Sequence, residues 1–187
     1  MKDGFIKVAA ATPEIKVADC KYNAKQIISL AKELAKKDVK LAVFPELCIT
    51  GYTCQDLFYQ TTLLDGAKNA LITILDELSE LDMITVVGLP MQYDSKQYNC
   101  AAVTYHGKVL GYVPKQYLPN YNEFYEMRHF TAWDGSKCEY FLNHTSSAIT
   151  MGRMCRLTNF WTYFIFSFMG SFILRKRSGT IFSPIKL

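Results

Sequence analysis

The feature that most limits the fold of this chain is a series of short apolar runs, each closely followed by a proline. Proline has no backbone N–H to donate to a neighbouring strand, so each run predicts a buried strand that ends near its proline. The runs and their prolines are Phe5–Ala11 with Pro13, Leu41–Phe44 with Pro45, and Met83–Gly88 with Pro90.

Two longer amphipathic stretches separate these runs. The first follows Asp19, a residue type that caps helix N-termini, and its apolar residues recur at helical spacing. They are Ile27, Ile28, Ala31, Leu34 and Ala35. The second stretch carries the same pattern from Leu63 to Leu78. Each stretch therefore predicts a helix with one buried face.

Two further strands are predicted after the third run. Gln97–Tyr105 and Lys108–Val113 flank His106-Gly107, a pair that is typical of a tight hairpin turn. The predicted order is strand, helix, strand, helix, strand and then the hairpin. Strands that are joined through helices lie in one layered sheet, so this order predicts an α/β domain.

Composition places the chain among ordinary globular proteins. Its length of 187 residues is that of a single domain. Of these residues, 50% are apolar and 20% are charged, which is typical of a globular protein. Its 6 cysteines are too few for a disulfide scaffold. The N-terminus has no apolar stretch of the kind found in secretory signals, so we expect a reducing, cytoplasmic compartment.

The net charge of +4 comes from the C-terminal part of the chain. Residues 151–187 contain six Lys and Arg and no acidic residue, which leaves residues 1–150 with 15 basic against 17 acidic residues, or −2. Because the basic residues form a tail rather than a face, they do not indicate nucleic-acid binding. We expect an α/β region at 1–150 and an atypical basic, aromatic region at 151–187.

Two polar residues stand where predicted strands end. Glu46 follows the second strand and Pro45. Lys115 follows the last strand and Pro114. Ligands of open α/β sheets bind at this edge, where a carboxylate suits a general base and a lysine suits the stabilisation of negative charge. From the residues alone, a turn-capping glutamate and an exposed lysine remain open alternatives.

The two stretches around these residues resemble the carbon–nitrogen hydrolase (nitrilase) superfamily, and within it the glutaminase domains of glutamine-dependent NAD synthetases. The first reads Phe-Pro-Glu-Leu-Cys-Ile-Thr-Gly-Tyr at 44–52. The second reads Lys-Gln-Tyr-Leu-Pro-Asn-Tyr-Asn-Glu-Phe-Tyr-Glu at 115–126. Residues 5–12 and 86–90 fit as well. The resemblance implies the N-terminal part of a four-layer αββα sandwich, truncated in this chain.

The resemblance also implies amide hydrolysis by a Glu–Lys–Cys triad. It assigns roles to four positions: Glu46 as general base, Lys115 as oxyanion partner, Glu123 as a supporting glutamate and Tyr121 as part of the glutamine pocket. A cysteine thiolate attacks the glutamine side-chain amide and releases ammonia. This part needs no cofactor or metal. A separate synthetase domain uses ATP and magnesium to amidate deaminated NAD, and the family implies a homo-oligomer.

The nucleophile of that triad is absent from its expected place. The family carries it in a motif such as Cys-Glu-Asp-Leu-Trp, which this chain lacks. Cys48 and Cys54 belong to the first motif, and Cys100 lies in a predicted strand. Cys155 has none of the expected neighbours, so it is a poor candidate. We therefore expect a truncated, inactive chain that also lacks the synthetase domain.

The tail leaves three interpretations open. Residues 157–174 are uncharged and precede Arg175-Lys176-Arg177, which meets the minimum length of a membrane span. Their aromatic and polar content argues against that, and a frame-shifted product would explain the tail and the lost motif together. The three interpretations of the chain are the glutaminase part of an amidotransferase, a non-catalytic binding module with a nitrilase fold, and a membrane-tethered nitrilase-like protein.

Overall fold

The computed structural model describes residues 5–140, 149–152 and 181–186. Its helices are α1 (Cys20–Lys36), the short 3-10 helix η1 (Gln55–Tyr59), α2 (Thr61–Glu77) and α3 (Glu126–His129). Its strands are β1 (Phe5–Ala10), β2 (Leu41–Val43), β3 (Ile84–Tyr93), β4 (Lys96–Tyr105), β5 (Lys108–Pro114), β6 (Lys137–Tyr140), β7 (Ile149–Gly152) and β8 (Ile181–Lys186).

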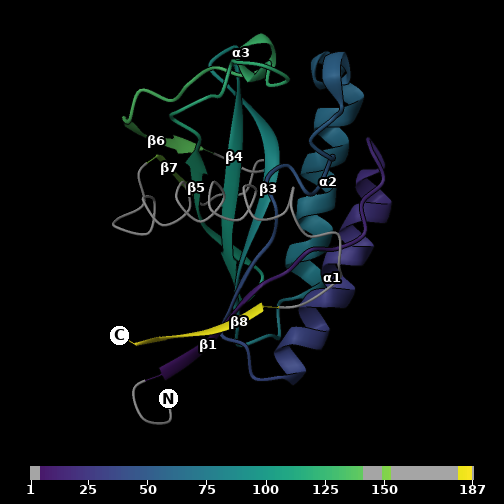
Figure 1. Cartoon of the computed structure of the whole chain (residues 1–187), viewed down its shortest axis with the longest axis vertical. Helices are drawn as coiled ribbons and strands as arrows, with labels where there is room; N and C mark the ends of the chain where they lie inside the picture. The colour runs from purple at the N-terminus through teal and green to yellow at the C-terminus, as the bar shows by residue number, and fades with distance from the viewer. Residues whose placement is uncertain (1–4, 141–148, 153–180, 187) are drawn as a thin grey trace.

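The described strands join one sheet in the order β6-β7-β5-β4-β3-β2-β1-β8. β1, β2 and β3 pair in parallel, because α1 and α2 return the chain to the same end of the sheet between them. β3, β4 and β5 then pair antiparallel. Figure 1 shows α1 and α2 side by side against this sheet. The predicted α/β class is confirmed.

The two long helices pack their apolar stripes on one face of the sheet. The predicted cap is confirmed, since the Asp19 carboxylate accepts a hydrogen bond from the Tyr22 N–H at 3.0 Å. The predicted apolar stripe of α1 is buried except at Ala35, which is partly buried. The buried residues of α1, α2 and this face of the sheet form the main hydrophobic core.

Tight turns build the antiparallel part of the sheet. His106 and Gly107 join β4 to β5 with φ angles of 45° and 69°, and two positive φ angles are the mark of a type I′ turn. The predicted hairpin is therefore confirmed. A second hairpin, which the sequence analysis did not expect, joins β3 to β4 through Asp94 and Ser95 with φ angles of 47° and 58°.

The prediction that Pro90 ends the third strand is wrong. β3 continues through Pro90, which lies opposite Asn99 of β4. The Gly88 carbonyl points to the edge of β3 that faces away from β4, where it accepts a hydrogen bond from the Ile49 N–H at 3.2 Å. Backbone groups two residues apart point to the same side, and β2 pairs with β3 only as far as Val86. None of the described strands therefore lies opposite the missing N–H of Pro90.

A smaller apolar cluster lies on the opposite face of the sheet, which we call the second face. Val43, Val86 and Ala101 are buried there. Side chains alternate between the faces of a strand, so Asn99, two residues before Ala101, also belongs to the second face. The sheet thus carries a helix-covered face and a second face with polar residues near the strand ends.

Two short strands from the C-terminal region join the sheet. β7 pairs with β5 and β6, and β8 runs antiparallel to β1, beside it at the lower end of Figure 1. The stretch 157–174 and Cys155 lie outside the described residues, so the membrane interpretation remains untested there. Within the residues that are described, no helix is long and apolar enough to cross a membrane.

Candidate active site

Glu46 lies in a tight turn that is held against the second face of β3. The next residue, Leu47, has a φ of 51°, in the left-handed region that bulky residues rarely adopt. There is no room for a side chain beneath the turn, because a Cβ on Gly88 would lie 2.9 Å from the Pro45 carbonyl oxygen. The close approach to Gly88 therefore fixes where Glu46 can lie.

Lys115 reaches the same place from the end of β5. Its backbone N–H donates to the Asn99 carbonyl at 2.8 Å, and its Nζ lies 2.7 Å from Oε1 of Glu46. Only 10% of the Lys115 side chain and 4% of the Glu46 side chain are exposed. Glu46 and Lys115, which each follow a predicted strand, therefore meet beyond the strand ends, and the alternative of an exposed lysine does not fit.

A second carboxylate contacts Lys115, and it belongs to Glu126. Lys115 Nζ lies 2.8 Å and 2.9 Å from the two oxygens of Glu126, and the Tyr52 hydroxyl donates to Oε1 of Glu126 at 2.8 Å. The sequence-based interpretation placed the supporting glutamate at Glu123 and needs correction. Glu123 is exposed on the loop before α3, whereas Glu126 is buried at the start of α3.

Asn99 is a site residue that the sequence analysis missed. It is fully buried in β4, and its Nδ2 donates a short hydrogen bond to Oε1 of Glu46, the oxygen that Lys115 also contacts. Oε2 of Glu46 is buried and has no hydrogen-bond partner among the described residues. The available signal was a single amide inside the otherwise apolar run at 98–103.

The cluster contains one lysine and two carboxylates away from water. Burial, and then the charge of Glu46, raise the pKa of the Glu126 carboxyl above its usual value, against the opposing effect of Lys115. Burial and the hydrogen bond to Glu126 raise the pKa of the Tyr52 phenol. Tyr52 therefore remains a hydrogen-bond donor at neutral pH, and Glu126 retains a proton more readily than an exposed glutamate.

Aromatic rings connect Tyr121 to this cluster. The ring of Tyr121 packs edge-on against Phe124 at 5.7 Å between centroids, and Phe124 packs edge-on against Tyr52 at 6.5 Å. Tyr121 is 58% exposed. The role of Tyr121 in a glutamine pocket remains a prediction, but its ring lies at the outer end of a row that reaches the Glu126 contact.

Four buried cysteines are poorly suited to act as nucleophiles. Burial raises the pKa of the Cys48 thiol to about 12 and that of Cys20 to about 11. Burial also raises the pKa of Cys54 and Cys100. A thiol with a raised pKa carries little thiolate at neutral pH, and the thiolate is the reactive form. The described residues also contain no group of three or more His, Cys, Asp or Glu side chains placed to hold a metal.

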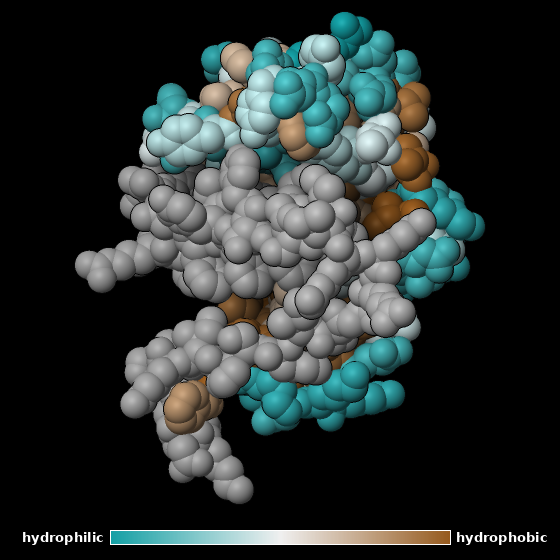
Figure 2. Space-filling view, in the orientation of Figure 1, coloured by the Kyte–Doolittle hydropathy of each residue, from teal (hydrophilic) through white to brown (hydrophobic). Residues whose placement is uncertain are grey.

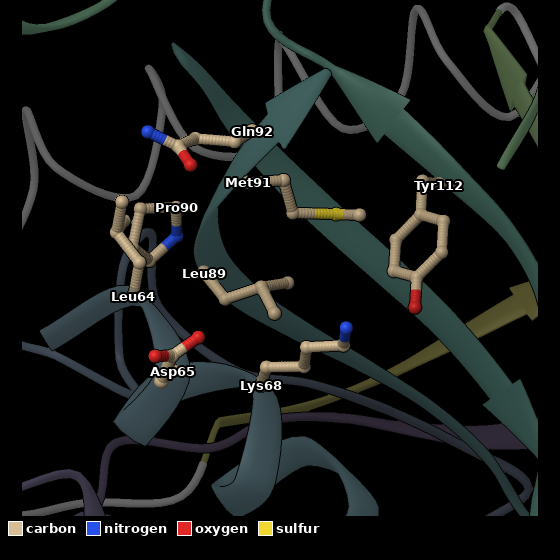
Figure 3. Close-up of a pocket in the computed structure, with 8 residues that line it drawn as sticks. All are labelled: Leu64, Asp65, Lys68, Leu89, Pro90, Met91, Gln92 and Tyr112. Atoms are coloured by element: carbon tan, nitrogen blue, oxygen red, sulfur yellow. The ribbon is translucent and has the colours of Figure 1, made fainter. Parts of the chain in front are cut away.

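A pocket of about 230 Å³ lies on the helix-covered face, away from the Glu46 cluster. Its lining residues are Leu64, Asp65, Lys68, Leu89, Pro90, Met91, Gln92 and Tyr112 (Figure 3). In Figure 3 the side chains of Leu89 and Met91 point towards Tyr112. They alternate along β3 with Pro90, which is opposite Asn99, so the pocket and the Asn99 side chain lie on opposite faces of the sheet.

An α/β sheet whose strand ends carry a lysine between two buried carboxylates agrees with a family assignment by sequence. A model of the carbon-nitrogen hydrolase family matches residues 7–156, a span that includes Glu46, Lys115 and Glu126. The match covers more than half of the chain. The chain therefore belongs to the carbon–nitrogen hydrolase family, which is a family of enzymes.

Curated relatives of the chain are glutamine-dependent NAD(+) synthetases. The chain is 40% identical to the one from Mycobacterium tuberculosis over 134 residues, which cover 72% of this chain and 20% of the relative. It is 35% identical to the one from Aquifex aeolicus over 126 residues, which cover 67% of this chain and 22% of the relative. The chain thus spans about a fifth of the length of these relatives.

Solved structures show the same fold. The glutamine-dependent NAD(+) synthetase from Cytophaga hutchinsonii matches with a TM-score of 0.75 and 30% identity, over 80% of this chain and 25% of that chain. An amidase from Nesterenkonia sp. matches with a TM-score of 0.61 and 20% identity, over 75% of this chain and 53% of that chain. The second likeness shows the fold alone.

Proposed function

We propose that Glu46, Lys115 and Glu126 form the base-and-cation part of a glutaminase site, as in a glutamine-dependent NAD synthetase. The observation that carries this proposal is the difference between the two oxygens of Glu46. Oε1 is held by Lys115 and Asn99, whereas Oε2 is buried without a partner among the described residues. A carboxylate held in this way can accept a proton on Oε2 while its orientation is maintained.

The proposed reaction follows from these positions. A cysteine thiol passes its proton to Oε2 of Glu46, and the sulfur attacks the side-chain amide carbon of glutamine. Lys115 stabilises the negative charge that forms on the amide oxygen. The carbon–nitrogen bond then breaks as the nitrogen takes the proton from Glu46 and leaves as ammonia. Glu46 then takes a proton from water, whose oxygen attacks the thioester carbon. The carbon–sulfur bond breaks, glutamate is formed, and the proton returns from Glu46 to the cysteine sulfur.

The proposal requires a cysteine nucleophile, and none of the four buried cysteines suits that role. The four buried cysteines have raised pKa values, and the chain has no Cys-Glu-Asp-Leu-Trp motif. Loss of a triad nucleophile removes a factor of about 10⁶ in rate. We therefore propose that the 187-residue chain alone does not hydrolyse glutamine. In a longer protein, a synthetase domain that uses ATP and magnesium would consume the ammonia, and we expect a cytoplasmic homo-oligomer.

The site itself is assigned no cofactor or metal in this proposal. Acyl transfer through a thiolate needs a base, an oxyanion partner and a water, and Glu46 and Lys115 supply the first two. Tyr121 is proposed to contact the glutamine from the outer end of its row of aromatic rings.

A second candidate is a non-catalytic module that binds an amide without cleaving it. The observation that favours it is the state of the described thiols, since burial raises the pKa of four of them. The two candidates differ in one respect: whether addition of a nucleophile restores hydrolysis.

Ammonia release from glutamine distinguishes the candidates. It is measured for the 187-residue chain and for a chimera in which residues 151–187 are replaced by the corresponding and following part of the Mycobacterium tuberculosis relative. We expect no release by the chain and release by the chimera. Glu46→Gln and Lys115→Ala in the chimera should each lower the rate by about 10³ or more. Lys32→Gln, at an exposed ion pair on α1, is the control that should leave the rate unchanged.

Two outcomes would contradict the proposal. One is full activity of the chimera after Glu46→Gln. The other is ammonia release by the 187-residue chain that Cys155→Ala abolishes, because the nucleophile would then be present in this chain. A folded chimera that binds glutamine without cleaving it favours the non-catalytic module.

A further inference from the structure

Two segments, 46–59 and 115–130, lie side by side and contact each other in the same order along both. The contacts, from the buried end to the exposed end, are Glu46 with Lys115, Tyr52 with Glu126, Asp56 with Arg128, and the Tyr59 hydroxyl with the Arg128 carbonyl. The first two contacts build the site described above. The last two lie outside it, and nothing in the proposed reaction uses them.

The short helix α3, which carries Glu126, cannot hold its own orientation. It has four residues, and a helix of one turn is not stable by itself. Its neighbour on one side is η1. The ring of His129 lies 5.7 Å from that of Phe58, and the ring of Phe130 lies 5.0 Å from Phe58. Gln97 of β4 holds the other end of α3, since its Nε2 donates to the His129 carbonyl at 3.2 Å. The contacts with η1 therefore contribute to the direction in which Glu126 points.

Arg128 and Asp56 make the most directional of these contacts. Arg128 Nε donates to Oδ1 of Asp56 at 3.0 Å, and Nη2 donates to Oδ2 at 3.1 Å. Two parallel hydrogen bonds between a guanidinium and a carboxylate fix rotation as well as distance. The same hydrogen bonds lower the pKa of Asp56, so the pair is ionised at neutral pH.

This ion pair is exposed, so it can orient α3 while it adds little to the free energy of unfolding. The Arg128 and Asp56 side chains are 60% and 66% exposed. Figure 2 shows hydrophilic residues gathered at the upper end of the molecule, where Figure 1 places α3. Solvent-exposed ion pairs contribute little to the free energy of unfolding. Removal of this pair should therefore leave the fold intact.

We propose that Asp56 and Arg128 are positioning residues for Glu126. Their two hydrogen bonds orient α3 so that the Glu126 carboxylate stays on Lys115 and Tyr52. Glu126 lies two residues before Arg128, so a rotation of α3 that breaks the ion pair also moves Glu126. The link to catalysis rests on the proposed function, whereas the geometric claim does not depend on it.

The test observes Lys115 directly in the 187-residue chain. A buried ammonium group that donates to two carboxylates exchanges its protons slowly, and its Nζ signal is visible by NMR in a ¹⁵N-labelled chain. Lys115→Arg identifies the signal by its loss. Arg128→Lys keeps the charge but removes the paired hydrogen bonds, and Asp56→Asn keeps the shape but removes the charge. Lys32→Gln removes an ion pair of similar exposure elsewhere and is the matched control.

We expect Arg128→Lys and Asp56→Asn to speed proton exchange at Lys115 by about two- to fivefold, because an exposed ion pair contributes little and the local opening of α3 becomes easier by that small amount. Their urea-unfolding midpoints should shift no more than that of the Lys32→Gln control. The charge swap Asp56→Arg with Arg128→Asp should restore slow exchange at Lys115. Exchange would not slow again in the swap if the single variants had only disturbed the local packing.

Unchanged exchange at Lys115 in both folded variants would overturn the proposal. A second outcome would also overturn it: exchange becomes faster only because the whole chain is less stable. In that case the unfolding midpoint falls by a matching amount, and the charge swap does not restore slow exchange. Because the measurement needs no hydrolysis of glutamine, a failure of the proposed function leaves its outcome unaffected.

Discussion

Glu46 and Lys115 contact each other at 2.7 Å between Oε1 and Nζ, although they lie 69 positions apart in the sequence. The contact forms only when the turn after β2 and the end of β5 both reach the second face of the sheet. Both side chains are almost completely withdrawn from water, so each charge depends on the other for compensation. This dependence makes the pair a sensitive reporter of the fold.

Removal of Lys115 should destabilise the chain strongly. Lys115→Met leaves two buried carboxylates without their cation, and an uncompensated buried charge of this kind costs about 3 kcal/mol or more. Urea unfolding followed by circular dichroism measures the loss. The double variant Lys115→Met with Glu46→Gln should recover part of it, because one of the two unpaired charges is then absent. A single variant within experimental error of the wild type would show that the pair is not buried in solution.

Two glycines should respond to alanine in opposite ways. Gly88→Ala places a methyl group 2.9 Å from the Pro45 carbonyl, so the turn that holds Glu46 must move, at a cost of about 1–3 kcal/mol. Gly66→Ala in α2 places its methyl group 3.5 Å from the Cys20 sulfur, which is an ordinary contact. Helix propensity then favours alanine by about 1 kcal/mol. Equal effects of the two substitutions on the unfolding midpoint would contradict this prediction.

The raised pKa of Glu126 predicts a particular pH dependence. The folded chain holds the Glu126 proton more tightly than the unfolded chain does. This contribution to stability therefore falls as pH rises from the ordinary value, about 4.3, through the raised value. Glu126→Gln removes the titration. The stability of this variant relative to wild type should then improve between about pH 4 and pH 7.

Glu123→Gln is the matched control for that experiment, because Glu123 is exposed and three positions away. It should show no such trend in urea titrations at the same pH values. A relative stability of Glu126→Gln that worsens with rising pH would mean that the Glu126 pKa is lowered rather than raised.

The buried thiols should react slowly in the folded chain. Burial raises the pKa of Cys48 to about 12 and that of Cys20 to about 11, so little thiolate is present at pH 8. Iodoacetamide labelling, read by peptide mass spectrometry, should be at least about tenfold slower at both residues than in the urea-unfolded chain. Cys138, which is partly exposed, serves as an internal reference. Rapid labelling of Cys48 would reopen the question of a nucleophile in the first motif.

The sequence alone determined the two long helices, five of the eight described strands and the two residues at the centre of the site. These features depend on neighbours in the chain. Asp19 caps the helix that it precedes, and the paired turn residues His106 and Gly107 set their hairpin. Glu46 and Lys115 each follow a strand and a proline, which places both residues at the strand ends, where ligands of α/β sheets bind.

The tertiary structure alone decided which other side chains complete the site. Asn99 contacts Glu46 because β4 lies between β3 and β5, a neighbour relation that no local pattern contains. Glu126 rather than Glu123 meets Lys115 because α3 packs against η1 and turns inward there. Both outcomes arise from contacts between segments far apart in the chain. Local propensity and spacing carry no information about such contacts, so the physical cause lies in packing.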